Sequence, residues 1–353
     1  MKRQTPLTPF ARLFTVVLLL GLLLAVASCS RDSREAQLKD YLLRLSRPLD
    51  LQLPEFEKTT SAAPPRAASL LVELETGSLD GLDFLRLRGC ALQTTIAKRN
   101  SSLGRVAPPS QRLLLELAFL RETPACIEKL SREEQHELAQ LLLENYELKK
   151  TQLPQLIFNA TLASPEFRDF WRSTEPLEHY PESTSSEPVA ALENIPADAG
   201  RWLSGDYRAQ EERFESALFQ ISQGDGGELL RALEQQGRYL LEADRITESR
   251  RSSGGLCGQG LEPKAAPIVR NVVTKYFAGG IQLWSAQLNT RYHALLPPIQ
   301  TLVQLTLGVL PESYAAWVEQ RDRALAEHLS APLTHVRAMQ GLLGSCYSEF
   351  APA

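Results

Sequence analysis

Apolar residues that recur three and four positions apart along most of the chain are the feature that most limits its fold. Leu113, Leu117 and Leu120 follow this spacing, as do leucines in many later segments. The spacing places such residues on one face of an α-helix, whereas a half-buried strand would alternate apolar and polar residues. The pattern predicts a mainly α fold, a multi-helix bundle, with short extended segments near the N-terminus around 51–56 and 70–75.

Capping residues and prolines predict where individual helices begin and end. Ser33 is a helix N-cap residue, and it predicts a short helix that runs through Leu45. Pro124 predicts the end of the helix that begins at Ser110, because proline removes a backbone donor and clashes with the preceding turn. The run Ser131-Arg132-Glu133-Glu134 matches a capping box, so the next helix is expected to start there.

Prolines and polar residues also divide the chain of 353 residues into segments. Four prolines and a Ser-Thr-Ser-Ser run fall between residues 174 and 197, a composition typical of a linker. The expected organisation is a signal peptide (1–28), a lipidated tether with a short helix (29–69), an N-terminal helical half (70–173), a linker (174–197) and a C-terminal helical half (198–349).

The first 28 residues have the composition of an export signal. Lys2, Arg3 and Arg12 precede an uncharged run from Leu13 to Ala27. Because a membrane-spanning helix needs about 20 apolar residues, this shorter run fits the apolar region of a secretory signal better than a permanent span.

The signal ends Val26-Ala27-Ser28-Cys29, which resembles the signal of bacterial lipoproteins. The resemblance implies that Cys29 is diacylated, becomes the first residue of the mature chain and anchors it, since two or more acyl chains give stable membrane attachment. An ordinary signal peptide followed by a chance cysteine is the alternative. Ser30 in the next position implies sorting to the outer membrane, where the body would face the periplasm.

Removal of the signal changes the charge of the chain. Residues 1–28 contain three of the 38 basic residues and none of the 42 acidic residues, so the net charge falls from −4 to −7. A body of this charge is not attracted to nucleic acid or to an anionic membrane surface. We therefore expect no nucleic-acid partner, and we expect the N-terminal lipid to provide the membrane attachment.

Four cysteines remain besides Cys29: Cys90, Cys126, Cys257 and Cys346. An even number in an exported protein predicts two disulfides, for which three pairings exist. Cys90–Cys126 with Cys257–Cys346 is favoured because each bond then stays within one half of the chain, and four reduced, buried cysteines are the alternative. No pair has Cys-x-x-Cys spacing, so a redox or zinc site is not expected.

The segment from Lys98 to Arg112 is the strongest candidate binding site in the sequence. It combines basic residues with hydroxyl and amide side chains in a loop expected between two helices, where guanidinium groups and backbone amides can hold an anion or an acidic partner. A solvated turn whose serine and asparagine residues cap the helices is the alternative. The candidate residues are Arg99, Asn100, Ser101, Ser102, Arg105 and Arg112.

Motifs of known catalytic chemistry are missing from the sequence. It contains no His-Glu-x-x-His pair, Walker loop or Gly-x-Ser-x-Gly elbow. The glycine runs at 224–227 and 254–260 lack the strand and helix that flank a nucleotide-binding loop, and they are interpreted as turns. No catalytic residue, metal site or cofactor is therefore expected.

Four groups of residues between positions 82 and 171 form a further recognisable pattern. They are Leu82–Leu85 with Cys90, Arg99–Gly104, Pro108–Leu113, and Ile157–Thr161 with Phe167 and Trp171. In these segments the chain resembles a family of exported bacterial lipoproteins catalogued as domain of unknown function 3080. The resemblance covers most of the mature chain and is strongest between residues 82 and 171. It implies a mostly helical envelope lipoprotein, and it implies no activity and no catalytic residues.

These observations predict an exported bacterial lipoprotein that acts as a binding or scaffold module at the outer membrane, with an envelope protein or the cell wall as its partner. The alternative is a hydrolase or lyase that acts on an envelope polymer through a carboxylate pair. A pocket with two convergent carboxylates, one of raised pKa, would favour the enzyme. A broad apolar groove without such a pair would favour binding.

Overall fold

The computed structural model describes residues 33–53, 63–75, 81–174, 176–257, 264–344 and 346–347. Over these ranges the chain forms helices and no strand, which confirms the mainly α prediction. The predicted signal segment 1–28 and Cys29 lie outside the described residues. In chain order the α-helices are α2 (Arg34–Ser46), α3 (Gly81–Arg86), α4 (Leu92–Asn100), α5 (Ser102–Arg105), α6 (Pro109–Arg132), α7 (His136–Thr151), α8 (Leu153–Ala160), α9 (Pro165–Phe170), α10 (Glu187–Leu203), α11 (Glu211–Ser222), α12 (Gly226–Ser252), α13 (Ala265–Val272), α14 (Gln282–Leu305) and α15 (Glu312–Leu343).

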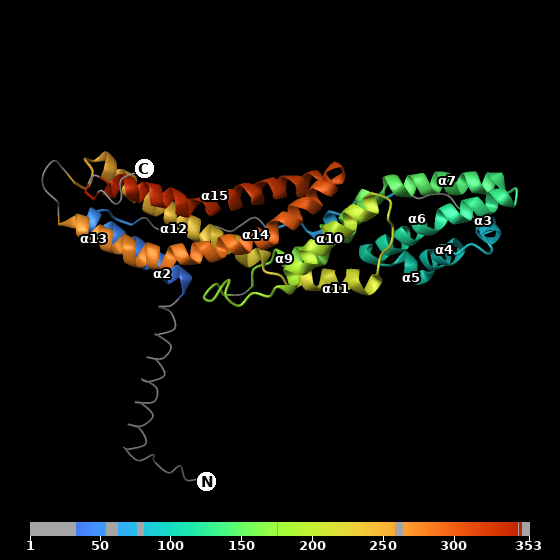
Figure 1. Ribbon diagram of the computed structural model, residues 1–353, viewed down its shortest axis with the longest axis horizontal. Helices are drawn as coiled ribbons and strands as arrows, with labels where there is room; N and C mark the ends of the chain where they lie inside the picture. The colour runs from blue at the N-terminus through green and yellow to red at the C-terminus, as the bar shows by residue number, and fades with distance from the viewer. Residues whose placement is uncertain are drawn as a thin grey trace, which may run out of the picture.

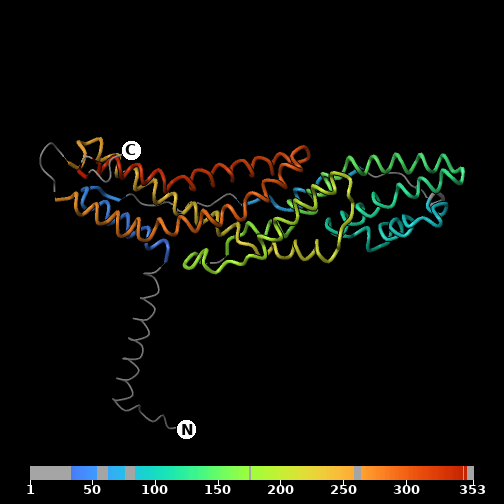
Figure 2. The backbone as a smooth tube through the Cα atoms, in the orientation of Figure 1, coloured from blue at the N-terminus to red at the C-terminus, as the bar shows by residue number. Residues whose placement is uncertain are grey.

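The helices form an elongated body, with α2 and α13 toward one end and α3 to α7 at the other (Figure 1). The two longest helices, α12 and α15, pack against each other. Helix α2 lies beside α12 and α13 although it comes more than 170 residues earlier in the chain, as the tube in Figure 2 shows. A π-helical segment, η4 (Val273–Ile281), joins α13 to α14 and also contacts α2.

Most buried apolar side chains belong to one core that draws on both predicted halves of the chain, with Phe158 and Trp202 among its members. A smaller core lies between α4, α6 and α7 and contains Leu92, Phe119 and Leu142. The far end of the molecule therefore has an apolar centre of its own.

Both favoured disulfides are confirmed. The Cα atoms of Cys90 and Cys126 are 5.5 Å apart, and those of Cys257 and Cys346 are 5.4 Å apart. The first bond ties the segment before α4 to α6 in the smaller core. The second ties the segment after α12 to the segment after α15.

Two of the predicted helix boundaries differ in the structure. Ser33 caps α2 as predicted, since its hydroxyl accepts a hydrogen bond from the Ala36 N–H. Pro124, however, lies inside α6, which continues to Arg132 because Leu120 before the proline and Cys126 after it are both buried in the body. Consequently Ser131 lies near the end of α6 and starts no helix.

The predicted linker 174–197 is only partly irregular. Helix α10 begins at Glu187, and its Leu192 and Ile195 are buried in the main core. Pro188 lies in the first turn of α10, a position where the missing N–H has no helical partner to lose. The residues before it form the 176–186 loop, which connects α9 to α10. The boundaries of the two predicted halves stay a prediction.

The extended segment 71–75 runs along α8 and is held by side-chain amides instead of a neighbouring strand. Asn159 accepts from the Val72 N–H at 2.9 Å and donates to the Val72 carbonyl at 2.8 Å. Gln152, two helical turns earlier, donates to the Glu75 carbonyl at 3.1 Å. The two amides therefore satisfy backbone groups that a strand would pair in a sheet.

Replacement of Asn159 by alanine is expected to lower the free energy of unfolding by about 1–3 kcal/mol, because both polar groups of Val72 lose their partner. Urea denaturation measures the change. Asn145→Ala is the matched control, because Asn145 is equally buried and bonds only to the Leu141 carbonyl of its own helix. Equal losses in the two variants would show that Asn159 does not hold the segment.

Candidate functional site

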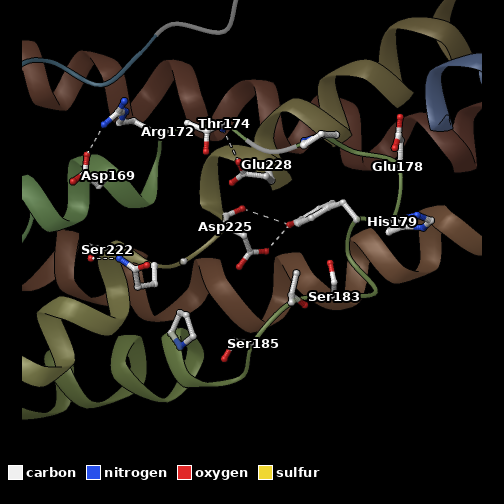
Figure 3. Close-up of a pocket in the computed structure, with 16 residues that line it drawn as sticks. Asp169, Arg172, Thr174, Glu178, His179, Ser183, Ser185, Ser222, Asp225 and Glu228 are labelled. Carbon is white, nitrogen blue, oxygen red and sulfur yellow. Dashed lines mark hydrogen bonds and ion pairs between the residues drawn. The ribbon is translucent and has the colours of Figure 1, made fainter. Parts of the chain in front are cut away.

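A polar cleft of about 710 Å³ lies between the 176–186 loop and the turn that joins α11 to α12 (Figure 3). We call it the Asp225 cleft, because the Asp225 carboxylate lies at its centre in that view. Its other lining residues include hydroxyl and charged side chains, namely Asp169, Arg172, Thr174, Glu178, His179, Ser183, Thr184, Ser185, Ser222 and Glu228.

Asp225 is fixed by groups from two other parts of the chain. Arg291 on α14 binds both carboxylate oxygens, with Nε at 2.9 Å from Oδ2 and Nη2 against Oδ1, and the Tyr180 hydroxyl donates to Oδ2 at 2.8 Å. Arg291 Nη2 also donates to the Ser185 carbonyl at 3.0 Å. One guanidinium therefore joins α14 to the α11–α12 turn and to the 176–186 loop.

The loop is held on its inner side by its own aromatic residue. Tyr180 is buried, and burial next to Asp225 raises the pKa of its hydroxyl well above the usual range. Its carbonyl accepts a hydrogen bond from Trp284 Nε1 at 2.8 Å. The tyrosine therefore stays protonated and donates to Asp225, and the wall of the cleft is positioned before any ligand arrives.

The glycines beside Asp225 allow the turn to approach α9 closely. A Cβ atom on Gly226 would lie 2.1 Å from the Phe170 ring, and one on Gly227 would lie 2.4 Å from the Arg172 backbone. The predicted turn at 224–227 is confirmed at Gly224 and Asp225, whereas Gly226 and Gly227 lie in the first turn of α12. The sequence does not predict the role of Asp225. The available signal was an acidic residue between glycines directly before a long helix.

A second carboxylate of the cleft also has an internal partner. Glu228, in the first turn of α12, is 6% exposed and accepts a hydrogen bond from the Thr174 N–H at 2.9 Å. At the rim, Asp169 pairs with Arg172 at 3.1 Å. Each of the two central carboxylates therefore accepts at least one hydrogen bond from the protein itself.

The structure brings the six candidate residues from 99 to 112 together where α4, α5 and α6 meet. The Ser101 hydroxyl caps α5 through the Gly104 N–H at 3.0 Å. Arg105 donates to the Asn100 carbonyl at 3.0 Å, and Arg112 donates to the Arg105 carbonyl at 2.9 Å. Ser102 is exposed in the first turn of α5. Anion binding by this segment stays a prediction.

The remaining candidate, Arg99, belongs to a buried charge cluster. Its Nε lies 3.0 Å from Oε1 of Glu116, and Lys149 Nζ lies 3.4 Å from the same oxygen. Burial lowers the pKa of Lys149 because desolvation disfavours its charged form. Arg99 therefore helps to join α4 to α6 and α7 as well as facing solvent.

A third polar cluster attaches α2 to the body. His335, which is 0% exposed, lies between the Tyr41 hydroxyl at 2.5 Å and Asp244 Oδ1 at 2.6 Å. Because a carboxylate accepts, the imidazole Nδ1–H donates to Asp244, and Nε2 is hydrogen-bonded to the Tyr41 hydroxyl. The rings of Phe277 and Tyr41 pack against the imidazole. These contacts join α2, α12, α15 and η4.

No group of three or more histidine, cysteine or acidic side chains in the described ranges is placed to hold a metal ion. None of the helices described combines the length and the apolar character that a membrane crossing requires.

Replacement of Asp225 by asparagine is expected to lower the free energy of unfolding by roughly 3 kcal/mol, because it leaves the charge of buried Arg291 uncompensated. Urea denaturation measures the change. In the control Glu319→Gln, loss of the exposed Arg323–Glu319 pair is expected to cost less than about 1 kcal/mol. Comparable losses in the two variants would contradict the role given to Asp225.

Comparison with known proteins gives one match. The model of a family described as protein of unknown function (DUF3080) matches residues 38–349. Neither a curated protein nor a solved structure matches the chain. The matched range includes the Asp225 cleft, both disulfides and nearly all of the described helices, and the chain belongs to the DUF3080 family.

Proposed function

We propose that this chain is an exported bacterial lipoprotein, anchored to the outer membrane through Cys29, whose body faces the periplasm and binds a cell-envelope ligand in the Asp225 cleft. The observation that carries the binding role is the cleft itself, a preformed polar site whose walls are fixed by Asp225, Arg291 and Tyr180. The observation that supports the anchor is the Val26-Ala27-Ser28-Cys29 signal.

The position of α2 suits an anchored protein. Its N-cap, Ser33, comes four residues after Cys29, and Tyr41 in the same helix is hydrogen-bonded in the core. A lipid on Cys29 would therefore be joined to the folded body by a very short segment. Such a body stays close to the membrane surface.

The chemistry of the cleft indicates the class of ligand. Hydroxyl groups such as Ser183 and Ser222 both donate and accept hydrogen bonds, which suits ligands rich in hydroxyl and amide groups. The acidic side chains Asp169, Glu178 and Glu228 disfavour an anion. The ligand we propose is a neutral or cationic part of the cell wall, such as the sugar hydroxyls and peptide amines of its polymer.

A binding role is favoured over the alternative of an envelope-polymer hydrolase or lyase. Asp225 and Glu228 converge on the cleft, as that alternative requires. However, Asp225 accepts from Arg291 and Tyr180, and Glu228 accepts from the Thr174 N–H. A general acid must release its proton to the substrate, and internal donors already occupy these carboxylates.

The anchor is tested by replacing Cys29 with serine in the full chain. The variant is expected to lose incorporation of labelled palmitate and to move from the membrane fraction to the soluble periplasmic fraction, because no other lipid attachment is proposed. Ser30→Asp is the matched variant, which should keep the palmitate and move from the outer to the inner membrane fraction. Continued labelling of the Cys29→Ser variant would rule out the anchor.

The ligand is tested with soluble cell-wall fragments released by a muramidase, titrated calorimetrically into the purified protein. Ser183→Trp should weaken binding at least about 10-fold, because the indole fills the cleft that exposed Ser183 lines. Ser253→Trp is the control, since exposed Ser253 follows the opposite end of α12, about 40 Å away. Failure of the unmodified protein to bind the fragments would exclude this ligand class.

A further inference from the structure

A second cleft, of about 620 Å³, opens beside the first turn of α2. We call it the α2 cleft. Ser33, Arg34 and Glu35 line it from α2, and the 176–186 loop contributes Glu178. One face of α12 supplies the remaining charged side chains, which are Arg231, Glu234 and Arg238.

The charges of the α2 cleft are balanced, unlike those of the whole molecule. Its lining contains three guanidinium groups and three carboxylates, whereas the chain after residue 28 carries a net charge of −7. Arg231 and Arg238 are seven residues apart on α12 and therefore lie on the same side of that helix. The cleft thus presents both signs of charge within one concave surface.

Arg34 is held in place at the edge of the cleft. Its Nη2 pairs with Glu182 of the 176–186 loop at 2.8 Å, and its guanidinium lies 5.7 Å from the centre of the Trp284 ring. Only 16% of the Arg34 side chain is exposed. The position of this guanidinium is therefore set by the protein before a ligand binds.

The α2 cleft lies close to the proposed anchor. Ser33 is part of its wall, and the four residues from Cys29 to Ser33 span at most about 14 Å when fully extended. Helix α2 begins at the edge of the body beside the 176–186 loop (Figure 1). If Cys29 carries acyl chains, the cleft must lie near the headgroup layer of the membrane that holds them.

We propose that the α2 cleft binds the phosphoethanolamine headgroup of a zwitterionic phospholipid in that membrane. Guanidinium groups of Arg34, Arg231 and Arg238 recognise the phosphate, and the carboxylates of Glu35 and Glu234 accept hydrogen bonds from the primary ammonium. A lone anion would contact only the guanidinium groups of this site. A trimethylated choline has no N–H to donate to them.

This inference rests on the proposed anchor, and it adds that the headgroup fixes the orientation of the body on the bilayer. A lipid on Cys29 alone would leave the body free to rotate about a short segment. A headgroup held in the α2 cleft gives a second attachment point. The Asp225 cleft, which shares Pro176 and Glu178 with the α2 cleft, is then held in a fixed direction relative to the membrane.

The experiment is native mass spectrometry of the full mature protein in detergent, titrated with dihexanoyl phosphatidylethanolamine. One molecule is expected to bind each protein, and Arg238→Ala should weaken binding about 10-fold through loss of a charge-assisted contact. Arg245→Ala is the matched control, because Arg245 lies seven residues, or about two turns, after Arg238 on the same helix. Its side chain is 78% exposed and does not line the cleft. Its affinity should be unchanged.

Dihexanoyl phosphatidylcholine and inorganic phosphate distinguish the possible sources of binding. Either compound should bind at least about 10-fold more weakly than the ethanolamine lipid, because choline has no N–H to donate and inorganic phosphate has no ammonium group. Equal binding of either compound, or equal effects of the two arginine variants, would overturn the inference.

The same mass spectra report the acyl chains on Cys29 separately. A protein without acyl mass would refute the anchor, whatever its lipid affinity. An acylated protein that binds no ethanolamine lipid would refute the α2 cleft assignment and leave the anchor standing.

Discussion

The ion pair between Asp225 and Arg291 is the interaction on which the central part of this molecule depends. Removing both charges from water is costly, and the pair offsets that cost through two guanidinium hydrogen bonds and further bonds to Tyr180 and Ser185. These contacts hold the 176–186 loop on α14. The loop in turn pairs with α2 through Glu182, so both clefts take their shape from one buried pair.

The helical fold is largely predictable from the sequence because its causes are local. The three-and-four spacing of leucines predicts the helices, and the N-cap at Ser33 and the two disulfides agree with the structure. The errors arise where packing outweighs a local signal. Burial on both sides of Pro124 continues α6, and burial of Leu192 and Ile195 makes α10 part of the core instead of a linker.

The clefts were not predictable in the same way. The Asp225 cleft joins Thr174, Asp225 and Arg291, which are separated by about 50 to 120 residues and belong to no common motif. An amphipathic pattern shows which face of a helix is buried, but it does not show which helix covers it. By contrast, the basic residues of the 99–112 segment are close together in sequence, and the sequence therefore predicts a binding site there. In the structure their guanidinium groups contact Glu116 and backbone carbonyls.

The two disulfides lie toward opposite extremities of the elongated body, one in the smaller core and one where α12 and α15 end. Covalent bonds therefore limit fraying at the two ends of the body. Between them, the described part of the chain contains no further disulfide and is held by apolar packing, hydrogen bonds and ion pairs. Under a pulling force along the body, deformation would therefore concentrate between the two disulfides, where both clefts lie.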